Sequence, residues 1–336
     1  MYDCDLLAQL GARRDSVRYL GSTASLRDKM LQVTSTNTSI AKLVNKIIDG
    51  DAYDLLGLLP PDSVDLIITS PPYWGHRDYD LKHNWKLFND IKRVRKIGTK
   101  SPGYVWYRAQ GGILGLEPYP EWYITHLIEI FQRAASCLKP QGNLWVNLGD
   151  TYFARWSSIR NNGRQGFADK KRKRRKTPMG DFRAEKQLLL MPARFAMAMQ
   201  DKKWILRNDL IWHKPNALPL RESDRLNLAH EHFFHFVKRP SYGRAKYFFD
   251  ATHLESRQTD VVSILVERGE NGHTATFPKA LIRPRILSSC PPEGIVLDPF
   301  CGTGRVLEVA IESNRRAIGF ELQEKFVKSA AERLRR

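Results

Sequence analysis

The stretch Gly294–Leu322, "GIVLDPFCGTGRVLEVAIESNRRAIGFEL", decides the predicted fold of this 336-residue chain. Its first apolar run ends at Asp298, and two glycines, Gly302 and Gly304, follow in a turn before a helical pattern begins. A second apolar run then ends at Glu321. This order predicts a strand, a glycine loop, a helix and a second strand, which is the repeating unit of parallel sheets covered by helices.

The same stretch also predicts a nucleoside site. Glycines in the turn let a ligand approach the backbone, and an acid at the end of the next strand can hydrogen-bond the two hydroxyls of a ribose. The loop lacks the third glycine of the dinucleotide fingerprint, and no lysine follows it as in a phosphate loop. A nucleoside without a diphosphate, such as S-adenosylmethionine, fits this pattern best. A tight turn that binds no ligand is the alternative.

Segments upstream of this stretch continue the alternation of strands and helices. Residues 42–73 read as strand, helix and strand, and a helix from about Pro120 to Leu138 leads through a Pro-Gln-Gly turn to a strand ending at Asp150. Further patterns predict a helix over 191–202, strands over 204–214 and 230–239, a helix over 277–290 and a last helix after Glu321. We therefore expect an α/β fold with a mainly parallel, doubly wound sheet.

Three segments break this regularity. Residues 1–43 form a polar N-terminal extension, either a short helical arm or an ordered extension, before a catalytic domain over 44–336. Two basic inserts, at about 80–113 and 153–187, interrupt that domain. The second contains the run "KKRKRRK", Lys170–Lys176, which repels itself in isolation and is expected to order against phosphates. A solvated loop or a nuclear localisation signal are the other interpretations.

The charge of the chain indicates the class of partner. Lys and Arg number 54 against 36 Asp and Glu, a formal net charge of +18. Such an excess favours a polyanion, with nucleic acid first and an anionic membrane surface second, although a basic and inert surface is also consistent with it. No apolar run is long enough to cross a bilayer, and the N-terminus does not resemble a secretion signal.

Cysteine usage excludes two further classes of site. The four cysteines are scattered and have no CxxC spacing, so the sequence predicts neither a disulfide framework nor a zinc site. Together with the absence of a secretion signal, this predicts an intracellular, cytoplasmic protein.

A second unusual stretch is "TSPPYWGHRDY", Thr69–Tyr79, directly after the apolar run "SVDLII". Its two prolines have no N–H to donate, so they end sheet pairing and leave a backbone carbonyl held in one direction. Tyr73 and Trp74 follow where a loop usually carries small polar residues. Taken alone, the stretch fits an ordinary strand-ending turn equally well.

Together, "TSPPY" and "DPFCGTG" resemble the catalytic [DNS]PP[YFW] motif and the FxGxG cofactor motif of DNA amino-methyltransferases, which methylate cytosine N4 or adenine N6. The catalytic motif comes more than 200 residues before the cofactor motif, as in the circularly permuted β class of that family. The resemblance covers about residues 44–335 and includes "LKPQGNLWVNLGD", "IWHKPN" and "AHEHFFHFVK". It implies a Rossmann-like methyltransferase fold.

The resemblance also implies partners and roles. It implies S-adenosylmethionine as methyl donor without a metal, double-stranded DNA as substrate, and either a restriction–modification system with a cognate endonuclease or an orphan or phage enzyme. Ser70, Pro71, Pro72 and Tyr73 would hold the target base. The cofactor residues would be Asp298, Phe300, Gly302 and Gly304 on the methionine and ribose side, Glu321 on the ribose hydroxyls, Asp51 near the adenine amine and Phe277 in the wall.

Physical chemistry explains how the residues of this catalytic motif would act on an exocyclic amine. The lone pair of an exocyclic amine is delocalised into the ring, so acceptors on its two N–H groups favour the change towards a tetrahedral nitrogen. The free carbonyl of the proline pair and the hydroxyl of Ser70 are such acceptors, and Tyr73 provides a stacking face for a base rotated out of the duplex. The absence of a Pro-Cys motif disfavours methylation of cytosine C5.

The family's habit indicates the target base. Serine at position 70 leans towards cytosine N4, whereas aspartate there leans towards adenine N6, so N4 is favoured and N6 is the alternative. Further alternatives are a catalytically inactive DNA-binding protein on the same scaffold and methylation of RNA or of a protein amide.

Target recognition is expected in the two inserts. The first of them mixes basic residues with Trp85, Tyr104, Trp106 and Tyr107. The stretch between "IWHKPN" and Phe277 is a further option. His213 and Lys214, at a strand end, either border the pocket or are simple surface residues.

Overall fold

The computed structural model describes residues 40–75, 82–84, 87, 100–153, 180–217, 223–254, 259–267 and 277–335. Most of the predicted N-terminal extension, Trp85 and the basic run Lys170–Lys176 lie outside these ranges. Among the described residues, no helix is both long and apolar enough to cross a membrane. The same residues contain no cluster of three or more His, Cys, Asp or Glu side chains suited to a metal ion.

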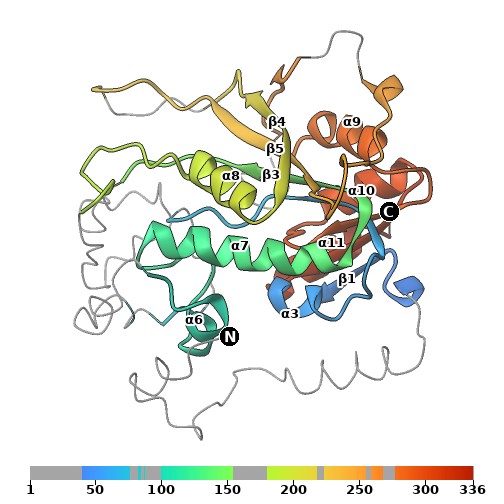
Figure 1. Ribbon diagram of the computed structural model, residues 1–336, viewed down its shortest axis with the longest axis horizontal. Helices are drawn as coiled ribbons and strands as arrows, with labels where there is room; N and C mark the ends of the chain where they lie inside the picture. The colour runs from blue at the N-terminus through green and yellow to red at the C-terminus, as the bar shows by residue number, and fades with distance from the viewer. Residues whose placement is uncertain are drawn as a thin grey trace, which may run out of the picture.

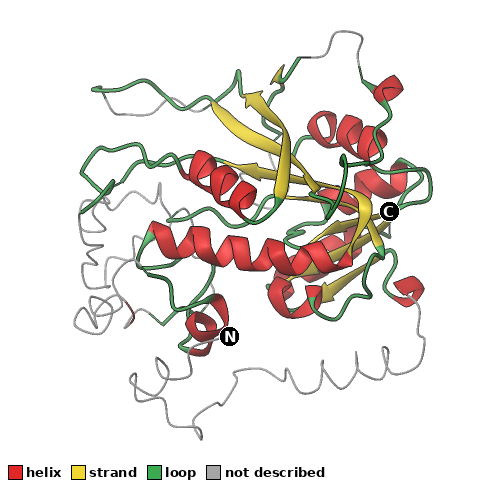
Figure 2. Ribbon diagram, in the orientation of Figure 1, coloured by secondary structure: helices red, strands yellow, loops and turns green. Residues whose placement is uncertain are grey.

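In the described part of the chain, eight strands form one sheet with helices on both faces (Figures 1 and 2). The strands are β1 (Lys46–Asp49), β2 (Val64–Thr69), β3 (Leu138–Leu148), β4 (Trp204–His213), β5 (His230–Lys238), β6 (Val261–Ser263), β7 (Ile295–Asp298) and β8 (Arg316–Glu321). Their order is β1-β8-β7-β2-β3-β5-β4-β6. All neighbours pair in parallel except β5, which is antiparallel to both β3 and β4.

The helices are α3 (Ala52–Leu56), α6 (Tyr104–Ala109), α7 (Pro120–Cys137), α8 (Met191–Asp201), α9 (Lys279–Ser289), α10 (Arg305–Glu312) and α11 (Glu324–Arg333), with 3-10 turns η1 (Ile40–Lys42) and η2 (Ala251–His253). In Figure 1, α7 runs across the front of the sheet with α8 beside it, and α9 lies at the upper right, next to α10. The two clusters of buried side chains place α9 and α10 on the opposite face of the sheet from α7 and α8. The doubly wound arrangement predicted from the sequence is confirmed.

The hydrophobic core consists of two clusters, one on each face of the sheet, because side chains of the central strands alternate between the faces. In β2, Ile67 packs into the cluster formed with α3, α7 and α8, whereas Leu66 and Ile68 pack into the cluster formed with α9 and α10. All six residues of β2 are buried, which explains why the strand reads as a continuous apolar run. Because successive side chains of a strand point to opposite faces, one apolar strand packs against the helices on both sides of the sheet.

The chain reverses its winding direction between β7 and β2. From β7 it passes through α10 to β8 on one side, and from β2 it passes through α7 to β3 on the other. In open α/β sheets, the crevice outside the carboxyl ends of the strands at such a reversal is where ligands bind. Thr69 and Asp298 are the last residues of these two neighbouring strands.

Several details differ from the sequence-based predictions. The predicted turn at Pro140–Gly142 lies within β3, where a bulge lets Val64 pair with Leu138 and Leu66 pair with Asn143. The strand β6 was not predicted, because three exposed or half-buried residues give no clear period.

The first insert was predicted to be irregular and to read DNA, and its second half corrects that prediction. Residues 104–109 form the helix α6, and Tyr104 and Tyr107 are 3% and 0% exposed. Both rings pack into the core with α7, so they cannot face a nucleic acid. The mixed aromatic pattern of this segment therefore reflects burial.

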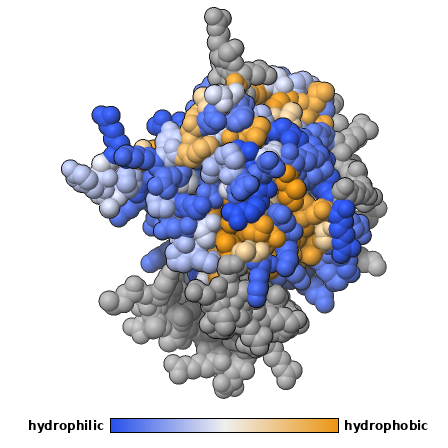
Figure 3. Space-filling model, turned by 90° about the vertical axis from the view of Figure 1, so that its right-hand side faces the viewer, coloured by the Kyte–Doolittle hydropathy of each residue, from blue (hydrophilic) through white to orange (hydrophobic). Residues whose placement is uncertain are grey.

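Figure 3 views the right-hand side of Figure 1 and shows hydrophilic side chains running between hydrophobic patches. The helices α9, α10 and α11 contribute many ion pairs to the surface, including those of Lys279, Glu308 and Glu312. This charged surface matters for the site because α10 begins directly after the glycine loop.

Candidate active site

A hydrogen bond at the winding reversal joins the two motifs found in the sequence. The Thr69 hydroxyl donates to Asp298 Oδ1 over 2.6 Å, although 229 residues separate the two. Both side chains are buried. The predicted catalytic loop, Ser70–Tyr73, therefore begins beside the predicted cofactor loop, Asp298–Gly304.

Backbone N–H groups and glycines shape the loop after β7. The N–H of Phe300 donates to Asp298 Oδ1 over 3.1 Å, and the N–H of Cys301 donates to the Phe320 carbonyl over 2.9 Å. Gly302 and Gly304 have φ of 52° and 79°, in the left-handed region that favours glycine. A Cβ on Gly302 would have no atom within 4 Å, so open space lies above the loop there.

Glu321 connects this loop to the end of β8. Its Oε2 accepts from the Gly302 N–H over 2.9 Å, and its Oε1 accepts from the Gln323 N–H over 2.8 Å. The carboxylate is half-buried, and burial raises its pKa. A carboxylate has about four lone-pair positions, so these two bonds leave acceptor capacity for a ligand.

Burial has a larger effect on Asp298. It raises the pKa of this carboxyl to about 7, although the hydrogen bonds from Thr69 and from the Phe300 N–H oppose the shift. A buried carboxyl whose pKa lies near neutral pH is typical of a functional site. A cationic ligand beside it would favour its charged form.

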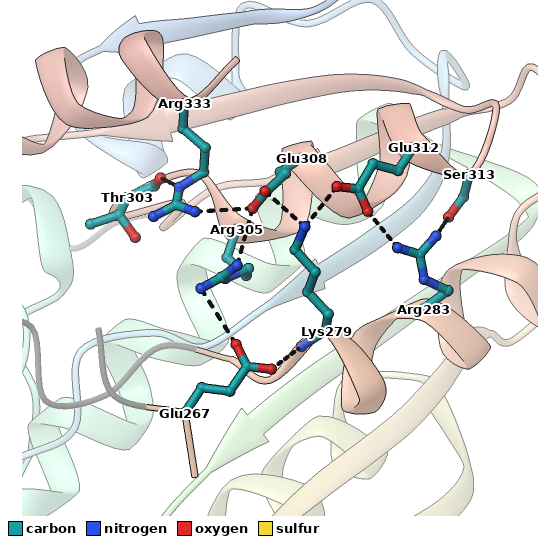
Figure 4. A network of polar contacts seen from close by, with 9 residues as sticks. All are labelled: Glu267, Lys279, Arg283, Thr303, Arg305, Glu308, Glu312, Ser313 and Arg333. Atoms are coloured by element: carbon teal, nitrogen blue, oxygen red, sulfur yellow. Dashed lines mark hydrogen bonds and ion pairs between the residues drawn. The ribbon is translucent and has the colours of Figure 1, made fainter. Parts of the chain in front are cut away.

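An ionic network on α9, α10 and α11 anchors the predicted cofactor loop (Figure 4). Arg333 Nε donates to the Thr303 carbonyl over 2.9 Å, and its Nη1 lies 3.1 Å from Glu308 Oε2. Lys279 Nζ lies 2.8 Å from Glu308 Oε1, and Arg305 also pairs with Glu308. Glu308 thus gathers three cations at the first turn of α10, and Arg333 ties them to the backbone of the loop.

Glu267 extends this network to the segment after β6. Its Oε1 accepts from the Lys279 backbone N–H over 3.0 Å, and its Oε2 lies 3.4 Å from Arg305 Nη2. Phe277, predicted to form part of the cofactor wall, is half-buried two residues before Lys279, and its ring centroid lies 5.6 Å from that of Phe233.

Asp51 follows β1, and both of its carboxylate oxygens have partners. Oδ1 accepts from the Tyr53 N–H over 2.9 Å and lies 2.7 Å from Arg108 Nη1, while Oδ2 accepts from the Tyr104 hydroxyl over 2.8 Å. Burial raises the pKa of Asp51, and Arg108 and Tyr104 oppose that rise. The helix α6 therefore holds this carboxylate in place at the edge of the sheet.

The loop after β2 is clamped by the segment that precedes α7. The Gly75 N–H donates to the Gly115 carbonyl over 2.9 Å, and the Trp74 indole N–H donates to the Glu117 carbonyl over 3.0 Å. Trp74 is only 5% exposed. Its ring therefore packs beneath the loop and does not form a pocket wall.

Tyr73 extends from this loop into a polar network. Its hydroxyl donates to Glu231 Oε2 over 2.8 Å, and it accepts from Ser70 Oγ over 3.3 Å and from Asn147 Nδ2 over 2.6 Å. Burial, followed by the charge of Glu231, raises the pKa of Tyr73 well above its usual value, so the phenol stays protonated. A Cβ on Gly149 would lie 2.8 Å from the Tyr73 ring, so glycine is needed there for close approach.

Glu231 and Lys214 complete this network. Lys214 Nζ forms an ion pair with Glu231 Oε1, and Asn147 Nδ2 donates to Glu231 Oε2 over 2.5 Å. Burial alone would raise the pKa of Glu231, but the Lys214 ammonium and the bonds from Lys214, Asn147 and Tyr73 outweigh it and lower that pKa. Of the two strand-end residues considered in the sequence, Lys214 borders the catalytic loop. His213 instead contacts Ser263.

Sequence reasoning missed Glu231 and Asn147 as site residues. Both occur in segments that carry the family resemblance, "AHEHFFHFVK" and "LKPQGNLWVNLGD". Their polar side chains interrupt otherwise apolar strands, and that interruption was the available signal. Asn147 is 1% exposed, and its Oδ1 has no hydrogen-bond partner among the described residues.

Comparisons with known proteins found similar sequences and structures. The family model described as DNA methylase, N6_N4_Mtase, matches residues 64–332. The Type II methyltransferase M.XycI of Xanthomonas campestris pv. cyanopsidis is 34% identical over 292 residues, covering 86% of this chain and 87% of that protein.

Solved structures show the same fold. The PvuII DNA methyltransferase (cytosine-N4-specific) matches with a TM-score of 0.59 and 19% identity over 85% of each chain. The M1.HpyAVI–SAM complex matches with a TM-score of 0.50 and 18% identity over 86% of this chain and 98% of that one.

Proposed function

The chain belongs to the DNA methylase family that modifies N6 or N4 amines, with the motif order of its β class, and from this premise we propose that it methylates the N4 amine of cytosine in double-stranded DNA with S-adenosylmethionine as methyl donor. The bond between Thr69 and Asp298 carries the proposal, because it joins the loop proposed to bind the base to the loop proposed to bind the cofactor. A methyl transfer needs donor and acceptor sites in contact.

The residues around the glycine loop fit the proposed donor. When bound, S-adenosylmethionine supplies a methyl group on a cationic sulfur. The open space at Gly302 and the buried carboxyl of Asp298 suit a cationic nucleoside that lies against the backbone. We assign Asp298, Phe300, Gly302 and Gly304 to its methionine and ribose side, Glu321 to the ribose hydroxyls, Asp51 to the adenine side and Phe277 to the wall.

The loop after β2 fits the target base. Among the described residues, no backbone N–H donates to the carbonyls of Pro71 or Pro72. A free carbonyl and the Ser70 hydroxyl can accept the two N–H groups of an exocyclic amine and favour its tetrahedral form. The half-buried Tyr73 ring provides the face against which a flipped base can stack.

The choice of cytosine N4 depends on Ser70. A neutral hydroxyl at this position accepts one N–H without adding a charge, whereas the adenine-N6 members of the family tend to have a carboxylate there. Adenine N6 is therefore the alternative product that the experiment must separate.

DNA contacts are proposed at the carboxyl edge of the sheet. The insert 153–187 begins and ends there, since Phe153 N–H donates to the Gln187 carbonyl over 2.7 Å and Leu189 N–H donates to the Thr151 carbonyl over 3.0 Å. The turn between β4 and β5 reaches the same place, where the Arg225 guanidinium lies 3.9 Å from the centroid of the Tyr152 ring. Basic residues in this insert would contact phosphates and orient the duplex.

The test is to incubate the protein with labelled S-adenosylmethionine and unmethylated DNA, digest the DNA to nucleosides and identify the labelled base by mass. N4-methylcytosine supports the proposal, and N6-methyladenine would replace it with the alternative. No label in any DNA would contradict the enzyme proposal and favour the inactive DNA-binding scaffold.

Two variants test the site assignment in the same assay. Gly302→Asp places a bulky anion in the open space above the loop, and Tyr73→Ala removes the stacking face. Each should abolish labelling. If both keep full activity, the site lies elsewhere.

A further inference from the structure

We propose that Glu231, anchored by Lys214, fixes the direction of the hydrogen bonds in the catalytic loop and so turns the Ser70 oxygen towards the target amine as an acceptor. This inference rests on the proposed function, because it gives a positioning role to two residues outside the base-binding motif. It starts from the chain of contacts Ser70–Tyr73–Glu231–Lys214.

The direction of each bond follows from the chemistry of its ends. An ionised carboxylate only accepts hydrogen bonds, so the Tyr73 hydroxyl must donate its single proton to Glu231. Towards its other neighbours the Tyr73 oxygen can only accept, and Ser70 Oγ donates to it. Because the Ser70 proton points to Tyr73, the Ser70 oxygen keeps its lone pairs for another donor.

Asn147 reinforces the same direction. One amide group, Nδ2, donates to both the Tyr73 hydroxyl oxygen and Glu231 Oε2. The reverse orientation would place the amide oxygen against the Glu231 carboxylate, which only accepts hydrogen bonds, so the amide nitrogen faces these two oxygens. The Tyr73 oxygen therefore receives two donors and gives its proton to one acceptor.

Lys214 keeps this acceptor ionised and in place. Its ammonium pairs with the other carboxylate oxygen of Glu231 and lies 4.3 Å from the Trp212 ring centroid, which holds the side chain at the strand end. A buried carboxylate without such a partner would favour its protonated form, which can donate as well as accept. The bond directions would then no longer be unique.

The consequence for catalysis concerns Ser70. A hydroxyl that donates towards the target amine would repel its N–H groups, whereas a hydroxyl turned away accepts one of them. The Ser70 oxygen is thus already oriented to accept from the amine before the reaction begins. Such preorganised acceptors lower the activation barrier of the methyl transfer. Glu231 acts through Tyr73, so it is a positioning residue and does not touch the base in this proposal.

The decisive experiment uses Glu231→Gln, Lys214→Met and the double variant. In Glu231→Gln, the Lys214 ammonium attracts the amide oxygen, so the amide nitrogen faces Tyr73 and reverses the chain of bonds. We expect kcat to fall about 100-fold, as for the loss of one preorganised acceptor, while the affinities for S-adenosylmethionine and for DNA change little.

Adding Lys214→Met to Glu231→Gln removes that attraction and lets the amide oxygen face Tyr73 and Asn147. We expect kcat of the double variant to be about tenfold higher than kcat of Glu231→Gln. A merely structural role predicts the opposite, since removing a second buried partner should make the variant worse. Recovery supports the proposal, and a further loss or an unchanged kcat in Glu231→Gln overturns it.

Tyr73→Phe provides a second test as the background of a double-variant cycle with Glu231→Gln. It keeps the stacking ring but interrupts the chain between Ser70 and Glu231, so Glu231→Gln should cause no further loss in the Tyr73→Phe background. A full additional loss would overturn the proposal. Methylation of any base by the wild-type protein separates these outcomes from a failure of the proposed function.

Discussion

The Thr69 hydroxyl donates to Asp298 Oδ1 over 2.6 Å, and this bond opposes the rise of the Asp298 pKa to about 7 that burial causes. If Asp298 faces a cationic ligand, the affinity for S-adenosylmethionine should fall as pH is lowered through about 7, because protonation removes the negative charge. Thr69→Val removes the donor and should move that midpoint to higher pH. Thr69→Ser keeps the hydroxyl and should leave it unchanged.

Titration calorimetry of the ligand from about pH 6 to about pH 9 measures this midpoint. The same carboxyl affects stability with a defined sign. Its folded-state pKa lies above its unfolded value, so the folded state binds more protons between about pH 4 and about pH 7 and the free energy of unfolding falls as pH rises through that range. An identical binding midpoint in Thr69→Val and wild type would refute the coupling.

Alanine at Gly302 and at Gly304 should affect the protein differently. Both residues have positive φ, so each substitution should cost about 1 kcal/mol or more of stability. A Cβ at Gly304 would also lie 3.0 Å from Ala330 Cβ, whereas a Cβ at Gly302 enters open space. We expect Gly304→Ala to lower Tm more and Gly302→Ala to weaken ligand binding more.

Thermal denaturation and calorimetry of the two variants separate these effects. Adding Ala330→Gly to Gly304→Ala relieves the contact and should recover part of the lost Tm. If Gly302→Ala binds S-adenosylmethionine as tightly as the wild type, the ligand does not approach the loop at that position.

Arg333 should contribute to cofactor affinity although it lies on the last helix. Arg333→Met removes the bond to the Thr303 carbonyl and the pair with Glu308, so the loop should loosen, with a several-fold weaker affinity and a Tm lower by about 2–4 °C. Lys328→Met is the matched control on α11, because Lys328 is exposed and forms its ion pair with the exposed Glu324. Equal effects of the two substitutions would argue against a specific anchor.

Trp74→Phe should destabilise the catalytic loop. It leaves the buried Glu117 carbonyl without the indole donor, which should cost about 1–3 kcal/mol in unfolding free energy and lower kcat. Trp106→Phe is the control for the change in ring size, because the Trp106 indole N–H is buried and has no partner among the described residues. Chemical denaturation compares the two, and an equal loss in both would show that the hydrogen bond contributes nothing.

Replacing four charges of the run Lys170–Lys176 by serine should weaken DNA binding at all sequences and flatten its dependence on salt. Each lost phosphate contact should reduce the slope of log K against log salt by about 0.9. The control replaces Arg239, Arg244 and Lys246, exposed residues that follow β5 at the opposite edge of the sheet. Fluorescence anisotropy over a salt series measures the slope, and a larger change in the control would place the DNA on that other edge.

Much of the fold was predictable because its signals are contiguous. The apolar periods predicted α7 to within a residue at its end, as well as β4, β5, β7 and β8. The bulge at Pro140–Gly142 was mistaken for a turn because the same residues favour both. Tyr104 and Tyr107 of α6 were expected to help read DNA although both are buried, because composition does not reveal which rings lie in the core.

The sequence by itself determined the glycine loop, the Pro71–Pro72 turn and the carboxyl ends of the strands before them, because turn chemistry and strand period depend on neighbouring residues. Only the tertiary structure decided which distant side chains meet. Glu231 reaches Tyr73 across 158 residues of sequence because β5 lies antiparallel beside β3, and its start therefore adjoins the end of β3. That strand order is a property of packing, so the polar network behind Ser70 could not be derived from local pattern.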